Sequence, residues 1–254
     1  MTQIYEEELI CLQRNVTFCD NEVRDKSPWL FPRIAIASFP GSGNTWTRHL
    51  VEQITGFYTG SIYCDKELRN RFKGECTKDK RILGIKTHDW KNPIEMDGYK
   101  KAIFILRSPY EAIIAWYKYK RAKGHTNDVE ESKFHSEDWF QSIQTESNYW
   151  VRLNYAWLKR FTGPMHLIMY NELKSNASLE ITKLAEFLER PLSNHDINCI
   201  IKNSEGEFHR PHTNQVAALN RYNETDQIHI DKHIENITNV LRLRFPFSNF
   251  KIPK

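Results

Sequence analysis

The feature that most constrains this chain is a short apolar run that ends in a glycine-rich turn and continues as a helical pattern, all within residues 33–50. Residues 34–39 (IAIASF) are rich in strand formers and too few for a helix, which predicts a strand buried on both faces. Residues 40–43 (PGSG) interrupt that pattern. Beyond Asn44, apolar residues recur at helical spacing, which predicts a helix.

A strand, a glycine-rich turn and a helix in this order can form an anion cradle. Glycines let the backbone approach a phosphate, and the helix N-terminus carries partial positive charge. The alternative is a βα turn that binds nothing, but hydroxyl groups at the helix start favour the cradle. The turn is not a Walker A loop, because Gly43 is followed by Asn44 and Thr45 where that pattern requires Lys and then Ser or Thr.

Length and charge set broad limits. A chain of 254 residues suits one α/β domain, and we expect residues 33–254 to form it, with residues 1–32 as a leader packed against it. The net charge of +4 fits an anionic ligand and is too small to indicate nucleic-acid binding. No apolar run approaches the length of a membrane span, and the first residues lack the charge order of a signal peptide.

Cysteines and sequons bear on the compartment. An odd cysteine count favours reduced thiols, although Cys64 and Cys76 bracket one loop and could pair in an oxidising compartment. Four asparagines stand in N-x-S/T sequons, which tilts the balance towards a secretory lumen: Asn15, Asn176, Asn223 and Asn236. The compartment stays open between the Golgi lumen, if the chain is a domain of an anchored protein, and the cytoplasm.

Two further predicted strands end in residues suited to chemistry. Residues 82–87 (ILGIKT) lead into Lys86-Thr87-His88, and residues 102–106 (AIFIL) lead into Arg107. Ligands of open α/β sheets bind at this carboxyl edge. A lone histidine at a strand end is more often structural, but His88 could take a proton from a hydroxyl, with Lys86 on the same side of the strand.

The remaining pattern completes an α/β fold. We predict helices beginning at residue 109 and over 137–161, 179–188 and 228–243, and a fourth strand over 166–169 that leads into Tyr170. Aromatic residues of the 137–161 helix are expected in the core. Residues 57–80 form a long connection, either an ordered lid or a solvated loop. The pattern indicates a three-layer αβα fold around a parallel sheet of about four to five strands.

The loop of residues 39–46 (FPGSGNTW) resembles the 5′-phosphosulfate loop of PAPS-dependent sulfotransferases, which typically reads Tyr/Phe-Pro-Lys-Ser-Gly-Thr-Thr-Trp. Gly41 stands where that family has lysine, and Asn44 where it has threonine. The run through Tyr58 is similar to the sulfotransferase domain of WSC-domain-containing proteins, a sialate O-sulfotransferase-like group that also has glycine there. The resemblance extends over residues 34–210 and implies a P-loop-like sheet.

The resemblance implies that PAPS (3′-phosphoadenosine 5′-phosphosulfate) is the cofactor, without a metal. The 5′-phosphosulfate would be held by Pro40, Gly41, Ser42, Gly43, Asn44, Thr45 and Trp46. Arg107 would bind the 3′-phosphate and Tyr170 would lie near the adenine, while Phe208 and Arg210 would complete the site. Ala115 replaces a serine that the family commonly has eight positions after the arginine.

The expected activity is transfer of the sulfuryl group from PAPS to an acceptor hydroxyl, with His88 as general base. Lys86 is the first candidate to replace the missing loop lysine, and Arg48 the second, although Arg48 is expected to face away. The acceptor is expected to be a glycan, with sialylated glycans among the candidates. The alternatives are a phenol or alcohol acceptor, a PAP(S)-binding pseudoenzyme or interaction module, and a P-loop kinase, which the missing Asp-based Mg²⁺ site disfavours.

Overall fold

The structure is a computed structural model, and it describes residues 11, 14–19, 33–122, 128–204 and 218–254. Its centre is a five-stranded sheet with the order β2-β3-β1-β4-β5, in which every neighbouring pair is parallel. The strands are β1 (Ile34–Ser38), β2 (Gly60–Ser61), β3 (Gly84–Thr87), β4 (Lys101–Leu106) and β5 (Met165–Met169). The expected parallel sheet of four to five strands is therefore confirmed.

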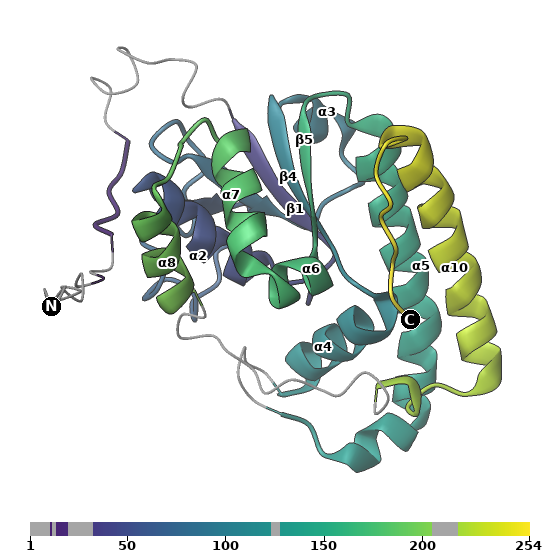
Figure 1. The fold of residues 1–254 in the computed structure, drawn as a ribbon. Coiled ribbons are helices and arrows are strands. Elements are labelled where there is room, and N and C mark those ends of the chain that lie inside the picture. Colours follow the sequence, from purple (N-terminus) through teal and green to yellow (C-terminus); the bar gives the residue numbers. More distant parts are fainter. Residues whose placement is uncertain (1–10, 12–13, 20–32, 123–127, 205–217) are drawn as a thin grey trace, which may run out of the picture.

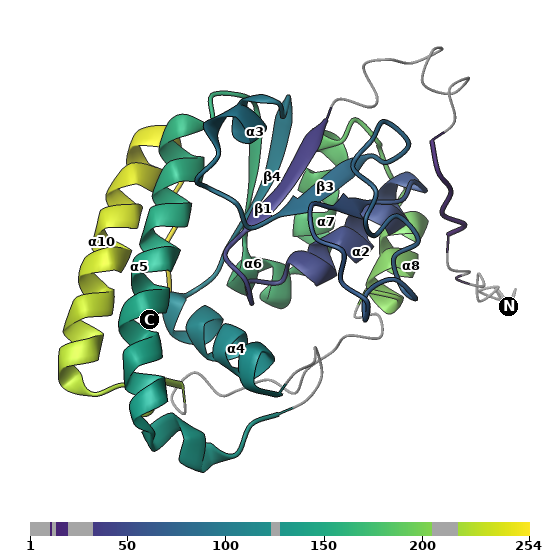
Figure 2. The same ribbon diagram turned by 180° about the vertical axis from the view of Figure 1, so that it is seen from behind.

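Helices cover both faces of this sheet (Figures 1 and 2). One face carries α2 (Asn44–Thr55), α7 (Ala177–Phe187) and α8 (Asn194–Lys202), and the other carries α4 (Pro109–Ala122), α5 (Glu137–Arg160) and α10 (Glu224–Arg244). Shorter elements are α3 (Pro93–Asp97), the 3₁₀ turn η2 (Glu131–His135) and α6 (Tyr170–Ser175). Within the described residues, no helix is long and apolar enough to cross a membrane.

Strand β1 joins the two layers because its side chains alternate between them. Ala35 and Ala37 pack into the core on the α4, α5 and α10 side, and Ile34 and Ile36 into the core on the α2, α7 and α8 side. All five residues of β1 are buried. The prediction of a strand buried on both faces is confirmed, and the central place of β1 puts the following turn in the middle of the sheet edge.

The helix α5 shows how far periodicity predicts burial. Trp139, Trp150 and Trp157 are fully buried, as expected of a core-facing stripe. Phe140 and Tyr155 are exposed, so most of these five aromatic residues lie in the core, as helix spacing predicts, and these two do not.

Five elements had no predicted counterpart: β2, α3, η2, α6 and α8. Strand β2 has only two residues, whereas α8 carries Ile197, Ile200 and Ile201 at helical spacing after a capping box, a signal that was missed.

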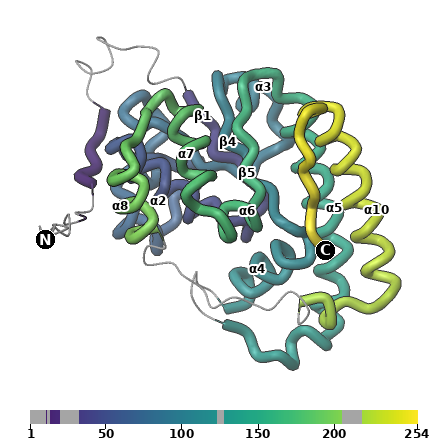
Figure 3. Tube along the Cα trace, in the orientation of Figure 1, coloured from purple at the N-terminus to yellow at the C-terminus, as the bar shows by residue number. Residues whose placement is uncertain are grey.

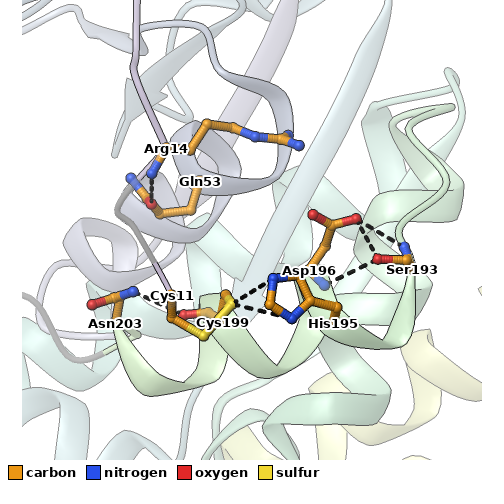
Figure 4. Close-up of a disulfide and its surroundings, with 8 residues drawn as sticks. All are labelled: Cys11, Arg14, Gln53, Ser193, His195, Asp196, Cys199 and Asn203. Carbon is orange, nitrogen blue, oxygen red and sulfur yellow. Dashed lines mark hydrogen bonds between the residues drawn. A yellow bond between two sulfur atoms is a disulfide. The ribbon is translucent and has the colours of Figure 1, made fainter. Parts of the chain in front are cut away.

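The cysteines correct another expectation. Cys64 pairs with Cys76, and Cys11 pairs with Cys199, so the expectation of reduced thiols was wrong for these four residues. Cys19 is buried. The pair Cys11–Cys199 joins residues 188 positions apart, and only the tertiary fold brings their Cα atoms to 5.0 Å (Figure 4).

Part of the expected leader lies against the domain (Figure 3). Thr17 forms a parallel bridge with Phe57, and the Arg14 backbone N–H donates to Gln53 Oε1 of α2 at 3.3 Å. With the Cys11–Cys199 bond, these contacts attach residue 11 and residues 14–19 to the α2 and α8 layer. The rest of residues 1–32 lies outside the described residues.

A buried ion pair joins α2 to the connection between β2 and β3. Arg48 Nη1 lies 2.6 Å from Glu75 Oε2, and both side chains are fully buried. The guanidinium also donates to the Thr59 hydroxyl at 2.9 Å and packs over the Phe72 ring. Burial lowers the pKa of Arg48, and the Glu75 carboxylate opposes that shift. A buried guanidinium therefore depends on its partner for compensation.

We expect Glu75→Gln to lower the free energy of unfolding by about 3–5 kcal/mol, because it leaves the buried Arg48 charge uncompensated. Urea denaturation under non-reducing conditions measures this loss. Glu235→Gln, at an exposed position of α10, is the matched control and should change stability little. A loss for Glu75→Gln within the range of surface pairs, about 0–1 kcal/mol, would show that the pair is not structurally important.

Candidate active site

The turn after β1 has the backbone of an anion cradle. Gly41 has φ +79° and Gly43 has φ +94°, a left-handed conformation that favours glycine at both positions. The Ser42 backbone N–H donates to the Phe39 carbonyl at 3.2 Å, which closes the turn, and α2 begins at Asn44 with Gly43 as its N-cap. The two glycines thus bring the loop backbone directly onto the N-terminus of a 12-residue helix.

Gly41 is constrained further by α4. A Cβ placed on Gly41 would lie 2.8 Å from the Ala112 carbonyl oxygen and 3.0 Å from the Ala115 Cβ. Two of the three positions at which the chain departs from the usual pattern, Gly41 and Ala115, therefore lie against each other. A lysine at position 41 would need both a strained φ and a displaced α4, so the close packing of α4 explains why no lysine stands there.

Unpartnered polar atoms cluster around the turn. The described residues contain ten buried side-chain N or O atoms without a hydrogen-bond partner, and five of them belong to this stretch or follow β4: Ser42 Oγ, Asn44 Oδ1, Trp46 Nε1, Thr47 Oγ1 and Ser108 Oγ. Four of the five can donate to an anion. Buried polar groups are normally satisfied, so the cluster fits a bound anion such as a phosphosulfate.

Arg107 reaches the turn from the end of β4. Its Nη1 donates to the Gly41 carbonyl at 2.8 Å, and its Nε donates to Glu111 Oε2 at 3.0 Å. The guanidinium lies 4.1 Å from the centre of the Tyr170 ring. Arg107 therefore lies beside the cradle, and its guanidinium donates to the Gly41 carbonyl and the Glu111 carboxylate. A phosphate that binds Arg107 would share these donors or displace one of the two acceptors.

Tyr170 closes the other side of the turn. A Cβ on Gly43 would lie 2.8 Å from two carbon atoms of the Tyr170 ring, so a side chain at position 43 has no room. The Trp46 ring meets the same tyrosine edge to face, with centroids 5.9 Å apart. Tyr170, Trp46 and Arg107 thus form one aromatic and cationic wall next to the cradle, as expected of a nucleotide site.

Asn44 ties the turn back to β1. Its Nδ2 donates to the Ile36 carbonyl at 2.9 Å and to the Ser38 Oγ at 3.2 Å. The side-chain amide therefore braces the start of α2 against the end of β1, and only its Oδ1 and backbone N–H remain for a ligand. Pro40 is buried and Thr45 is half-buried in the same turn.

His88 stands just past the end of β3 and points towards the end of β1. Its Nδ1 lies 2.7 Å from the Ser38 carbonyl oxygen. Since a carbonyl only accepts, Nδ1 carries the proton and Nε2 keeps its lone pair. Burial, with the Lys86 charge second, lowers the pKa of His88 to about 3. The imidazole is therefore neutral at neutral pH in the ligand-free protein.

Lys86 lies on β3, with its side chain only 6% exposed. Its pKa is lowered to about 8, mainly by burial and secondly by the Arg48 charge, while Glu75 and Asp65 oppose the shift. At neutral pH the side chain is therefore mostly charged. Among the described residues none forms an ion pair with Lys86. The Arg48 guanidinium is buried and forms its ion pair with Glu75.

The structure brings most of the predicted site residues to one sheet edge. The turn, His88, Arg107 and Tyr170 follow β1, β3, β4 and β5, four parallel strands that end together. Phe208 and Arg210 lie outside the described residues. Sequence reasoning missed the unpartnered Thr47 and Ser108 hydroxyls and Tyr63, which stacks on His88 at 5.5 Å. Thr47 directly follows Trp46 and Ser108 directly follows Arg107, two predicted site residues, and this adjacency is the only signal that the sequence offers for them.

Sequence comparisons give the family. A family model described as "Sulfotransferase domain" matches residues 31–236. A WSCD family member of Aedes aegypti is 33% identical over 198 residues, 76% of this chain and 62% of that relative. Sulfotransferase 1E1 of Homo sapiens is 27% identical over 188 residues, 66% of this chain and 63% of that protein. The chain thus spans about three fifths of the length of the curated relatives it matches.

Solved structures agree in fold. Mouse sulfotransferase SULT7A1, solved with PAP, superposes with a TM-score of 0.58 at 16% identity, over 83% of this chain and 84% of that one. Retinol dehydratase, in complex with androsterone and PAP, gives a TM-score of 0.51 at 15% identity, over 87% and 82% of the two chains. The αβα fold is shared with both. With the family model covering most of its length, the chain belongs to the sulfotransferase domain family.

Proposed function

We propose that this chain transfers the sulfuryl group of PAPS to a hydroxyl of an acceptor and releases PAP. One observation carries the proposal. A cradle of unpartnered buried donors lies between Arg107 and Tyr170 on one side and a neutral histidine on the other. PAPS, when bound, supplies the activated sulfuryl group. Two structural neighbours were solved with PAP, which supports the same nucleotide.

The site residues divide between holding the nucleotide and handling a proton. The backbone of residues 40–46 and the Ser42 and Thr47 hydroxyls would hold the 5′-phosphosulfate, and Arg107 with Ser108 would hold the 3′-phosphate. Tyr170 would lie against the adenine. Phe208 and Arg210 remain candidates for the same nucleotide. All of these contacts are positional, and in sulfuryl transfer positioning and charge neutralisation supply most of the catalysis.

His88 is suited to accept the proton of the acceptor hydroxyl at Nε2. The Ser38 carbonyl holds the Nδ1–H tautomer, so Nε2 has a free lone pair at every pH at which the protein works. A low pKa makes a weak base in the free protein. The pKa of an imidazole rises when an anionic donor occupies the adjacent cradle, because negative charge favours the protonated form.

Lys86 is suited to replace the missing loop lysine. Position 41 cannot carry a side chain without moving α4, so the positive charge has to come from elsewhere. Lys86 is buried, mostly charged at neutral pH and two residues from His88. Its ammonium and the loop N–H groups would stabilise the charge that develops on the leaving phosphate.

We infer a glycan acceptor in an oxidising lumen, the Golgi lumen being the candidate. Two disulfides favour a compartment in which thiols are oxidised. The asparagines of all four sequons are exposed: Asn15, Asn176, Asn223 and Asn236. The resemblance of residues 39–58 to the sialate O-sulfotransferase-like group supports a glycan acceptor, and glycan hydroxyls are abundant in that compartment.

One second function has an observation in its favour. Gly41 removes the cation usually found in the loop, which supports a domain that binds PAP or PAPS without turnover. Such a domain would keep the nucleotide contacts of the cradle and Arg107 and would show no transfer to any acceptor. The two functions make opposite predictions for the wild-type protein with labelled PAPS.

Incubation with ³⁵S-labelled PAPS and a panel of sialylated glycans, asialoglycans, phenols and steroids tests the proposal. We expect label on a glycan, a loss of about 10²–10⁴-fold in kcat for His88→Ala, and unchanged PAP affinity. Binding of PAP without transfer to any acceptor would favour the binding domain. Wild-type turnover by the His88→Ala variant would show that His88 is not the base.

A mobility shift after peptide N-glycosidase treatment of protein expressed in a secretory host tests the compartment.

Arg107→Ala should weaken PAPS binding by about 10–150-fold, the loss of one charge-assisted interaction. Binding of adenosine 5′-phosphosulfate, which lacks the 3′-phosphate, should hardly change. Titration calorimetry with both nucleotides measures the difference. Equal weakening for the two nucleotides would place Arg107 away from the 3′-phosphate. Glu111→Gln, which removes the carboxylate charge paired with Arg107 Nε, should not weaken PAPS binding and serves as the control.

Lys86→Met should lower kcat by about 10²–10³-fold with little change in PAP affinity, since the lost charge acts on the transition state. In the wild type, kcat/KM should fall as the pH rises through about 8, because the Lys86 ammonium then loses its proton. No acidic limb is expected near pH 6.5, because the pKa of His88 lies near 3. Lys91→Met, at an exposed position beyond His88, is the control. An unchanged kcat for Lys86→Met would leave stabilisation to the loop N–H groups.

A further inference from the structure

The loop closed by Cys64–Cys76 contacts the surroundings of both candidate catalytic residues. Tyr63, directly before Cys64, stacks on His88, and Glu75, directly before Cys76, forms the buried pair with Arg48 beside Lys86. The disulfide thus joins Cys64 and Cys76, the residues that directly follow Tyr63 and Glu75. The sequence left residues 57–80 as either an ordered lid or a solvated loop, and these contacts favour the ordered alternative.

Tyr63 contacts His88 in two ways. The two rings are stacked, with centroids 5.5 Å apart and an angle of 26° between their planes. The Tyr63 hydroxyl oxygen accepts a hydrogen bond from the His88 backbone N–H at 3.2 Å. On the other side, the Tyr149 hydroxyl of α5 donates to the His88 carbonyl at 2.7 Å.

These contacts replace a missing strand partner. The ladder between β1 and β3 ends at the pair Ala37 and Thr87, so His88 lies beyond the last sheet register. Its backbone N–H and carbonyl would otherwise have no ordered partner. Tyr63 and Tyr149 supply one each, and the orientation of the imidazole depends on a backbone that they hold.

The base of the loop is attached to β3. The Ile62 backbone N–H donates to the Lys86 carbonyl at 3.1 Å, and the Tyr63 N–H donates to the Ser61 hydroxyl at 3.0 Å. Within the loop, Leu68 and Phe72 are buried. The loop therefore has a small core and a defined position on the domain.

The Tyr63 side chain itself is weakly enclosed. It is 39% exposed, so few neighbours besides His88 restrain it. The bond from Cys64 to Cys76, with Cα atoms 4.5 Å apart, ties the next residue to the far end of the loop. Removing such a crosslink releases chain entropy at the point where Tyr63 is attached.

We propose that Tyr63 is a positioning residue for His88 and that the Cys64–Cys76 disulfide keeps Tyr63 stacked on the imidazole. The inference rests on the proposed role of His88 as the base. It assigns the loop of residues 63–76 to the acceptor side of the active site, opposite the nucleotide cradle. Loss of the disulfide should therefore impair proton transfer while leaving nucleotide binding intact.

Two substitutions of Tyr63 test the positioning role. Tyr63→Ala should lower kcat by about 10–100-fold, because a displaced base loses the geometry that proton transfer needs. Tyr63→Phe keeps the stacked ring and loses only the acceptor for the His88 N–H, so its loss should be smaller. PAP affinity should be unchanged in both. The rate at which diethylpyrocarbonate modifies His88, followed by mass spectrometry, should increase in Tyr63→Ala without any acceptor being present.

The two disulfides provide a matched comparison. Cys64→Ser with Cys76→Ser should reproduce the lower kcat and the faster His88 modification of Tyr63→Ala. Cys11→Ser with Cys199→Ser removes the bond between the N-terminal segment and α8 shown in Figure 4, and should leave kcat and His88 modification unchanged. Adding Tyr63→Ala to the Cys64/Cys76 double variant should cost little more, since residues that act as a unit are not additive.

The outcomes separate this inference from the proposed function. If His88→Ala abolishes turnover while Tyr63→Ala has wild-type kcat and wild-type His88 modification, the positioning role is wrong and the base stands. If His88→Ala has wild-type turnover, the proposed function of His88 fails, whereas the modification assay still reports on the contact. A parallel loss of PAP affinity in the Cys64/Cys76 variant would also overturn the inference, because it would indicate general unfolding of the site.

Discussion

The left-handed turn between β1 and α2 is the constraint on which the site depends. Two glycines with positive φ let the chain leave the central strand and start a helix within a few residues. Gly43 leaves room for Tyr170, and Gly41 leaves room for α4. A larger residue at either position would push apart elements that meet around the turn, among them α4 and the wall of Tyr170, Trp46 and Arg107. The missing loop lysine and the close packing of α4 therefore have one physical cause.

In the proposed mechanism, β3 carries the cation Lys86 and leads into the base His88, and β1 holds the base in place. At the end of β1, the Ser38 carbonyl accepts from His88 Nδ1 and so fixes the tautomer of the imidazole. The hydroxyl of Ser38 accepts a hydrogen bond from the Asn44 side-chain amide. The proposed base is thus joined to the cradle through two hydrogen bonds. Lys86 adds positive charge from β3, and it is kept next to the buried Arg48–Glu75 pair, which makes its pKa sensitive to the loop of residues 63–76.

Fold class followed from local pattern because β1 and β4 are apolar on both faces and the helices carry periodic stripes. The same local information placed the turn, Arg107 and Tyr170 at strand ends, and parallel strands that end together bring such residues to one edge. Strand β2 was not predicted because two residues are too few for a pattern, whereas the helical spacing of Ile197, Ile200 and Ile201 in α8 was overlooked. Exposure of Phe140 and Tyr155 was also decided by which helix packs on α5.

The sequence by itself determined the family, the parallel sheet and the chemical types of the proposed site residues, because each is written in consecutive residues. Only the tertiary structure decided how those residues act on one another. It paired Cys11 with Cys199, buried Arg48 against Glu75 and lowered the pKa of His88 through burial and Lys86. Each of these depends on distances between segments far apart in the chain, and neither spacing nor composition carries such distances.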